Sequence, residues 1–106
     1  MKPLALRDKD LDTLRRTLRQ FPCVREVLLF GSRATGRARR SSDIDLAISA
    51  PVASAAEWMD LVHAIQEVPI IYEFDILRAE STHNPSLLEK IARDGVTIYP
   101  DVPPVS

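Results

Sequence analysis

The sequence predicts an α/β (α+β) domain in which helices and strands alternate along 106 residues. Three observations support this prediction. Apolar residues recur at helical spacing in several segments, short apolar runs with strand-like alternation lie between those segments, and turn or capping residues separate them. We expect one domain over residues 1–99 and a flexible tail over residues 100–106, because that tail holds three prolines.

The first helix is indicated by Leu11, Leu14, Leu18 and Phe21, which are spaced along one side of a helix that ends before Pro22. Its apolar side is expected to pack on the sheet.

A strand is predicted over residues 24–30, an apolar run that stops at Gly31, after which Ser32 can open a short helix. The only cysteine, Cys23, cannot form an internal disulfide and is expected to be a small buried residue at the entrance of this strand.

Ser54 and Glu57 form a capping-box pattern that opens a second helix. The apolar side of this helix consists of Trp58, Leu61, Val62 and Ile65. Trp58 is therefore interpreted as a core residue rather than a platform for base stacking.

A further strand is predicted over residues 70–77, followed by a third helix with Asn84 as N-cap, Pro85 at its first position and Gly95 just past its end. Leu87, Leu88 and Ile91 are expected to face inward from this helix. A short strand over residues 96–99 completes the domain.

Two carboxylates, Asp43 and Asp45, alternate with Ile44 and Leu46. Successive strand side chains point to opposite faces, so both carboxylates are expected on one face, where they can bind the same cation. Carboxylate oxygens are hard ligands that suit Mg²⁺, which commonly binds through one or two carboxylates together with substrate phosphates.

The Gly31–Ser32 turn precedes these carboxylates by ten residues and is expected to bind phosphate. Gly31 allows close approach of the backbone, Ser32 offers a hydroxyl, and the free amides of a helix start favour anions. Several arginines follow the turn, and Arg33, which lies nearest to it, is the candidate among them for a phosphate contact. Arg39 and Arg40 are interpreted by default as part of a solvated surface.

A third acid is expected on another element, because a two-metal site generally needs a ligand for the ion that activates the nucleophile. We choose Asp75, which has apolar neighbours on both sides in the predicted strand, with Glu73 as the second choice.

Competing interpretations of these motifs are weaker. Gly31 and Gly36 have the spacing of a P-loop, but Arg37 and Ala38 replace the Lys and Ser/Thr which that motif requires. An Asp-Ile-Asp run is also typical of a solvated edge strand, and the Gly-Ser turn at the matching distance is what favours a site.

Composition limits the classes of binding partner and the cellular location that we expect. Fourteen basic residues against 15 acidic ones, with a pI near 6.1, give no general attraction to nucleic acid; duplex DNA is not expected, and a short RNA end stays open. The sequence shows no membrane-spanning stretch and no signal-peptide pattern, so a cytoplasmic location is expected. His63 and His83 have no Cys or His partner at metal-ligand spacing, which disfavours zinc; His63 is expected to be exposed, and for His83 both solvation and substrate contact stay open.

The chain from Leu11 to Tyr99 resembles the DNA polymerase beta-like nucleotidyltransferases, specifically the minimal nucleotidyltransferase (MNT) type. The matching segments are Gly31–Ser32, Asp43 with Asp45, residues 74–77, and residues 84–99. The resemblance implies a small mixed β-sheet flanked by about three helices.

It also implies transfer of a nucleoside monophosphate, AMP from ATP or the equivalent from another NTP, to an acceptor hydroxyl. By the same resemblance, Gly31, Ser32 and Arg33 would bind the triphosphate, Asp43 and Asp45 would each bind both Mg²⁺ ions, and Asp75 would bind the ion on the side of the nucleophile. The implied partner is a small all-helical HEPN-type or other substrate-binding protein, forming a hetero- or homo-oligomer. In antitoxin relatives, the MNT enzyme neutralises a HEPN ribonuclease by adding AMP to a tyrosine.

Two alternatives stay open. One is a non-catalytic module that binds and neutralises its partner and uses the pocket to sense nucleotides. The other is transfer to a small molecule such as an aminoglycoside, which is disfavoured because 106 residues leave little room for an acceptor-binding domain.

Overall fold

The computed structural model describes residues 6–31 and 44–100. The helix expected to start at Ser32 and residues 101–106 of the expected tail lie outside the described residues. The elements are α1 (Asp8–Leu18), β1 (Glu26–Phe30), β2 (Ile44–Ser49), α3 (Ala55–Gln66), β3 (Phe74–Arg78), the short 3₁₀ helix η1 (Ala79–Ser81), α4 (Pro85–Asp94) and β4 (Val96–Tyr99).

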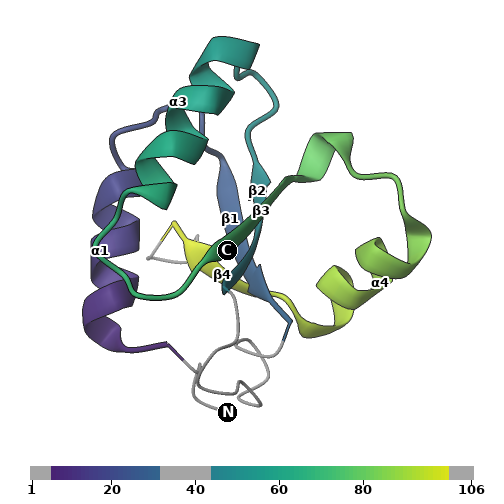
Figure 1. The fold of residues 1–106 in the computed structure, drawn as a ribbon. Coiled ribbons are helices and arrows are strands. Elements are labelled where there is room, and N and C mark those ends of the chain that lie inside the picture. The colour runs from purple at the N-terminus through teal and green to yellow at the C-terminus, as the bar shows by residue number, and fades with distance from the viewer. Residues whose placement is uncertain (1–5, 32–43, 101–106) are drawn as a thin grey trace.

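The four strands form one mixed sheet in the order β3-β2-β1-β4 (Figure 1). β1 runs antiparallel to both β2 and β4, whereas β2 and β3 are parallel. The prediction of a small mixed sheet with three flanking helices is therefore confirmed.

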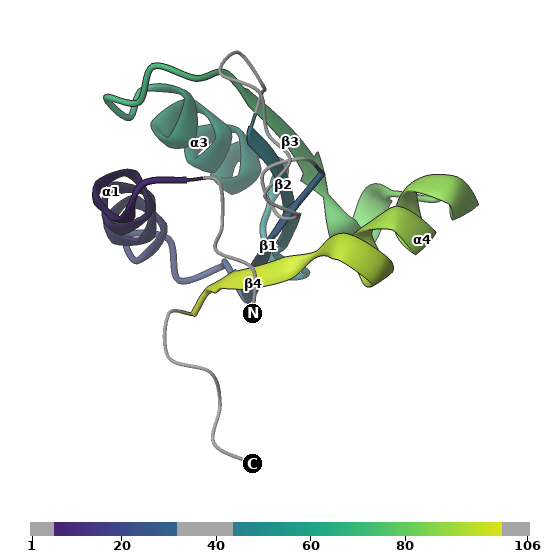
Figure 2. The ribbon, with the colours of Figure 1, turned by 90° about the horizontal axis from the view of Figure 1, so that it is seen from below.

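The helices form layers on the two sides of this sheet. α1 and α3 lie together on one side and α4 lies on the other, as the two perpendicular views show (Figures 1 and 2). The main core lies between the sheet and the α1–α3 layer, and its fully buried members include Leu14, Leu18, Leu29, Ile44, Leu46, Ile48, Leu61 and Ile65. Three of these come from alternate positions of β2, so the side chains between them point to the α4 side.

The helix starts predicted at Ser54 and Asn84 are confirmed. The Glu57 N–H donates to Ser54 Oγ at 3.1 Å, and the Ser54 N–H donates to Glu57 Oε1 at 2.9 Å. The Ser54 N–H and, to a smaller extent, the Ser54 side chain stabilise the Glu57 carboxylate and lower the pKa of Glu57. Asn84 Oδ1 accepts hydrogen bonds from the N–H groups of Ser86 and Leu87.

Several predicted bounds were wrong. α1 ends at Leu18, so Phe21 packs against the core from the following turn, where the Val24 N–H donates to the Phe21 carbonyl at 3.0 Å. β1 therefore begins at Glu26 rather than at residue 24. Likewise β3 covers Phe74–Arg78, not residues 70–77, because its pairing with the described part of β2 begins at Phe74.

α4 is less buried than its sequence predicts. No residue of α4, which lies wholly in the described part of the chain, is buried. Leu87 and Ile91 are half-buried, but Leu88 is 43% exposed, so the expectation that Leu88 faces inward was wrong. The physical reason is that, among the α-helices of residues 6–31 and 44–100, α4 is the one on its side of the sheet, while α1 and α3 share the other side (Figure 2).

The helices found in residues 6–31 and 44–100 fall short of the length and apolar character that a membrane span needs.

Candidate active site

Asp45 of β2 and Asp75 of β3 are direct neighbours across two parallel strands. Adjacent strands lie roughly 4.8 Å apart, and in-register residues project to the same face. Ile44 and Leu46, on either side of Asp45, are fully buried in the main core, so Asp45 and Asp75 point to the α4 side. Asp45 is half-buried and Asp75 is exposed, which leaves the pair open to a ligand.

The end of β1 brings a third predicted site residue to the same place. Phe30 pairs with Asp45, and the chain turns immediately afterwards at Gly31, where φ is +75°. A Cβ built on Gly31 would collide with Asp45 Oδ2. A residue without a side chain is thus required here both by the backbone conformation and by the approach of the Asp45 carboxylate.

Asp45, Asp75 and Gly31 therefore converge from three elements. The remaining predicted site residues, Asp43, Ser32 and Arg33, lie outside the described residues, as do Arg37, Arg39 and Arg40.

Glu73, the second choice for the third acid, precedes β3 and is exposed. Its carbonyl accepts a hydrogen bond from the Ile44 N–H at 2.8 Å, one residue before the Ile44–Phe74 pair of the ladder. The carboxylate next to Asp45 is that of Asp75, not that of Glu73.

Residues 12–101 match the family model described as polymerase beta, nucleotidyltransferase. The chain belongs to this nucleotidyltransferase family. No curated protein sequence matches it significantly.

Solved structures of the same fold include members of toxin–antitoxin systems. This nucleotidyltransferase domain superimposes on a chain of a toxin–antitoxin structure solved with AMP-PNP, with a TM-score of 0.68, 22% identity, and coverage of 84% of this chain and 72% of the other. A structure of a tri-AMPylated HEPN toxin from Shewanella oneidensis in complex with an MNT antitoxin matches with a TM-score of 0.65, 18% identity, and coverage of 89% and 72%. The MntA–HepT toxin–antitoxin structure matches with a TM-score of 0.63, 18% identity, and coverage of 88% and 72%. At these identities the similarity establishes the fold.

The residues at the nucleotidyltransferase site fit Mg²⁺ and a triphosphate. Two carboxylates side by side provide hard oxygen ligands, and Asp45 Oδ2 lies against Gly31 at the place where a Cβ would stand. Residues 6–31 and 44–100 hold no group of three or more His, Cys, Asp or Glu suited to a metal. A pair is sufficient for Mg²⁺ when phosphates complete its coordination, and Asp43 lies outside that part of the chain.

Four other residues singled out in the sequence lie in the described part of the chain. Trp58 is half-buried and packs against the core, as predicted, and Cys23 is a buried free thiol. His63 is exposed as expected, and His83 is exposed as well.

Sequence reasoning missed Arg78 and Glu80, which connect the end of β3 to the end of β2. A signal was present. Phe74 and Ile76 alternate onto the core face of β3, and the next position on that face is an arginine, a residue that is rarely buried without partners.

Proposed function

We propose that this chain is a Mg²⁺-dependent adenylyltransferase that transfers AMP from ATP to a hydroxyl on a separate helical HEPN-type partner, as the MNT antitoxin of a toxin–antitoxin pair. The observation that carries the proposal is the convergence of Asp45, Asp75 and Gly31 at one edge of a nucleotidyltransferase fold. Mg²⁺, when bound, would offset the charge of the phosphates and favour ionisation of the attacking hydroxyl.

Each residue has a defined task in this proposal. Asp45, together with Asp43, would hold the ions that bridge the triphosphate, and Asp75 would hold the ion next to the acceptor hydroxyl. Gly31 would admit the β and γ phosphates close to the backbone, with Ser32 and Arg33 as further phosphate contacts. Catalysis by such a site depends mainly on positioning and charge neutralisation rather than on covalent participation of the protein.

Structural relatives support the choice of nucleotide and of partner. One related structure contains AMP-PNP, and another contains a HEPN toxin carrying AMP groups in complex with an MNT antitoxin. A protein hydroxyl as acceptor and a cytoplasmic location form part of the same proposal.

The decisive experiment incubates the full chain and a co-expressed HEPN-type partner with ATP and Mg²⁺, and measures the partner's mass and the release of pyrophosphate. Asp45→Asn and Asp75→Asn should each lower the rate at least about a hundredfold, because each removes a charged ligand of the Mg²⁺ ions that would neutralise the reacting phosphates. The matched control is Asp12→Asn, because the Asp12 side chain is 63% exposed and belongs to α1, on the other side of the sheet. Full turnover of either site variant would overturn the site assignment.

The same experiment separates the alternatives. If the Asp43→Asn, Asp45→Asn, Asp75→Asn triple variant still binds and neutralises the partner, the chain is a binding module and the catalytic proposal fails. Pyrophosphate release that needs a small-molecule acceptor and leaves the partner's mass unchanged would instead indicate a small-molecule nucleotidyltransferase.

A further inference from the structure

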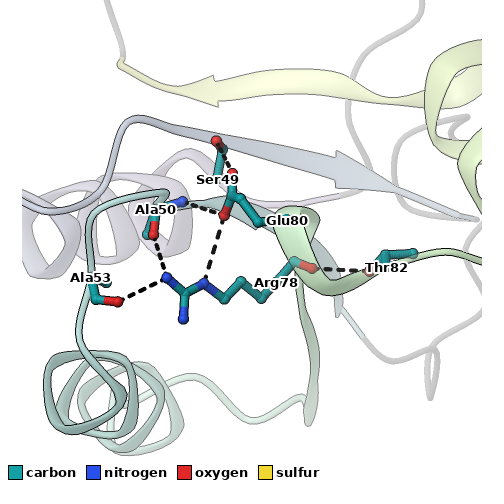
Figure 3. Close-up of polar contacts among 6 residues, drawn as sticks. All are labelled: Ser49, Ala50, Ala53, Arg78, Glu80 and Thr82. Atoms are coloured by element: carbon teal, nitrogen blue, oxygen red, sulfur yellow. Dashed lines mark hydrogen bonds and ion pairs between the residues drawn. The ribbon is translucent and has the colours of Figure 1, made fainter.

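The strand that carries Asp75 is held by contacts at its far end. Arg78, the last residue of β3, extends toward the connection between β2 and α3 (Figure 3). Its Nη2 donates hydrogen bonds to the carbonyls of Ala50 at 2.7 Å and Ala53 at 2.9 Å. The guanidinium also lies 5.4 Å from the centroid of the Trp58 ring, within the range of a cation–π contact.

Glu80 of η1 holds the same connection from the other side. Its Oε2 accepts a hydrogen bond from Ser49 Oγ at 2.6 Å, and its Oε1 accepts one from the Ala50 N–H at 2.9 Å (Figure 3). Arg78 Nε lies 3.7 Å from Glu80 Oε1. The N–H and the carbonyl of Ala50, a fully buried residue, are thus bound by side chains at the end of β3 and just beyond it.

β3 needs such an anchor because its apolar pattern does not define its register. In the sheet formed by residues 6–31 and 44–100, β3 is an edge strand whose one neighbour is β2. Tyr72, Phe74 and Ile76 alternate with polar residues or Leu77, and all three pack in or against the core. A slip of two residues would keep an apolar or aromatic side chain at each core position, so burial alone discriminates weakly against it.

The same slip would change the acid at the site. Moving β3 by two residues would replace Asp75 by Glu73 as the neighbour of Asp45. It would also displace Arg78 and Glu80 by about 6.6 Å along the sheet, farther than their hydrogen bonds to Ser49, Ala50 and Ala53 can stretch.

We propose that Arg78 and Glu80 form a register clamp, and that this clamp sets Asp75 rather than Glu73 beside Asp45. Arg78 and Glu80 are positioning residues that act through Asp75. The inference rests on the metal site of the proposed function.

The test uses the full chain with a non-hydrolysable ATP analogue and Mn²⁺, whose binding is followed by electron paramagnetic resonance. Arg78→Met should weaken Mn²⁺ binding about tenfold, the size of effect typical for residues that orient metal ligands. Arg78→Lys, which keeps the charge and one donor, should recover part of the affinity. The control is Arg16→Met, because Arg16 is a 65% exposed arginine on α1; it should bind Mn²⁺ like the wild type.

Neutralising each acid in turn, in the wild type and in Arg78→Met, distinguishes positioning from a general loss of stability. In the wild type, Asp75→Asn should weaken Mn²⁺ binding and Glu73→Gln should not. In the Arg78→Met background both registers are populated. Glu73→Gln should then weaken Mn²⁺ binding, and Asp75→Asn should weaken it less than in the wild type. If Arg78 had a purely structural role, Arg78→Met would lower the folded fraction, and Mn²⁺ binding would still depend on Asp75 and not on Glu73.

Hydrogen exchange provides an independent measurement. Amides of β3 should lose protection in Arg78→Met while amides of β1 and β4 keep theirs. If Arg78→Met unfolds the chain, Glu80→Gln is the second variant, because it retains the shape of the side chain and weakens the clamp. It should shift the dependence of Mn²⁺ binding from Asp75 toward Glu73, to a smaller degree than Arg78→Met.

The possible failures are separable. Mn²⁺ affinity and β3 protection that stay at wild-type levels in Arg78→Met would overturn the clamp and leave the proposed function intact. A wild type that binds Mn²⁺ with the analogue but never modifies a partner would overturn the proposed adenylyl transfer and leave the clamp intact. A wild type that binds no Mn²⁺ would overturn both.

Discussion

The two faces of the sheet use the same strands for different purposes. On the α1–α3 side, Ile44, Leu46 and Ile48 are fully buried among leucines and isoleucines of two helices. On the α4 side, the intervening positions include Asp45, and its neighbour on β3 is Asp75. One face therefore carries the buried core and the other carries the candidate site, and adjacent residues of β2 belong to the two faces.

The covering helices differ in the same way. α3 buries Leu61 and Ile65 completely, whereas α4 buries no residue and leaves Leu88 exposed. In the proposed function the α4 side must admit a nucleotide and an acceptor protein, and a second packed layer on that side would block both. The four predictions below test this division of roles, from the largest expected effect to the smallest.

The largest effect is expected in the core. Leu46→Ala should lower the free energy of unfolding by about 2–5 kcal/mol, because it opens a cavity among fully buried neighbours. Leu88→Ala on α4 should cost about 1 kcal/mol or less. Urea unfolding of both variants measures the difference, and equal losses would contradict the assignment of the core to the α1–α3 side.

Gly31→Ala should damage the open face more than the fold. Alanine with a positive φ costs about 1–2 kcal/mol, and its Cβ would push against the Asp45 carboxylate. A displaced ligand can lower the rate about a hundredfold. Parallel measurement of adenylyl transfer and of urea unfolding tests this, and a variant with full activity would show that the approach of Gly31 to Asp45 does not matter.

Loss of the α4 cap should remain local. Asn84→Ala removes the acceptor for two N–H groups and should cost about 1 kcal/mol. Because α4 buries no residue, we expect faster hydrogen exchange in α4 while the amides of β1 and β2 stay protected. Asn84→Asp, which can still cap the helix, serves as the control; fast exchange across the whole sheet would contradict the independence of the two sides.

The smallest effect concerns Glu80. Burial opposes its ionisation and is the largest single influence, but hydrogen bonds from Ser49 and Ala50, its own N–H and the charge of Arg78 together lower its pKa below the ordinary value of 4.5. The resulting stabilisation is fully present above pH 4.5 and is lost as the pH falls through the lower pKa of the folded state. Glu80→Gln cannot titrate, so the difference in unfolding free energy between it and the wild type should shrink as the pH falls below 4.5. A difference that stays constant with pH would exclude this role of the carboxylate.

Much of the fold could be predicted from the sequence because its signals are local. The caps at Ser54 and Asn84 depend on residues within one turn of the chain, and the opposite orientation of Leu46 and Asp45 follows from strand geometry alone. Asp75, which was chosen from the sequence as the third acid, lies next to Asp45. Metal binding by Asp43, Asp45 and Asp75, and phosphate binding by Gly31, Ser32 and Arg33, remain predictions.

The errors arose where distant segments decide the outcome. The exposure of Leu88 depends on how many helices share the α4 side, and the start of β3 depends on where its partner strand begins to pair. The sequence did not predict a role for Arg78 and Glu80, because their contacts are with Ser49, Ala50 and Ala53, which lie about thirty residues earlier in the chain.

The sequence by itself determined the element types, the helix starts, the faces of the strands and the family motif, because each of these depends on the spacing of residues along one segment. Only the tertiary structure decided the strand order β3-β2-β1-β4, the pairing of Asp45 with Asp75 and the contact of Gly31 with Asp45. The physical reason is that strand register is an interaction between segments, and the apolar alternation around Phe74 is compatible with more than one register until the polar contacts of Arg78 and Glu80 select one.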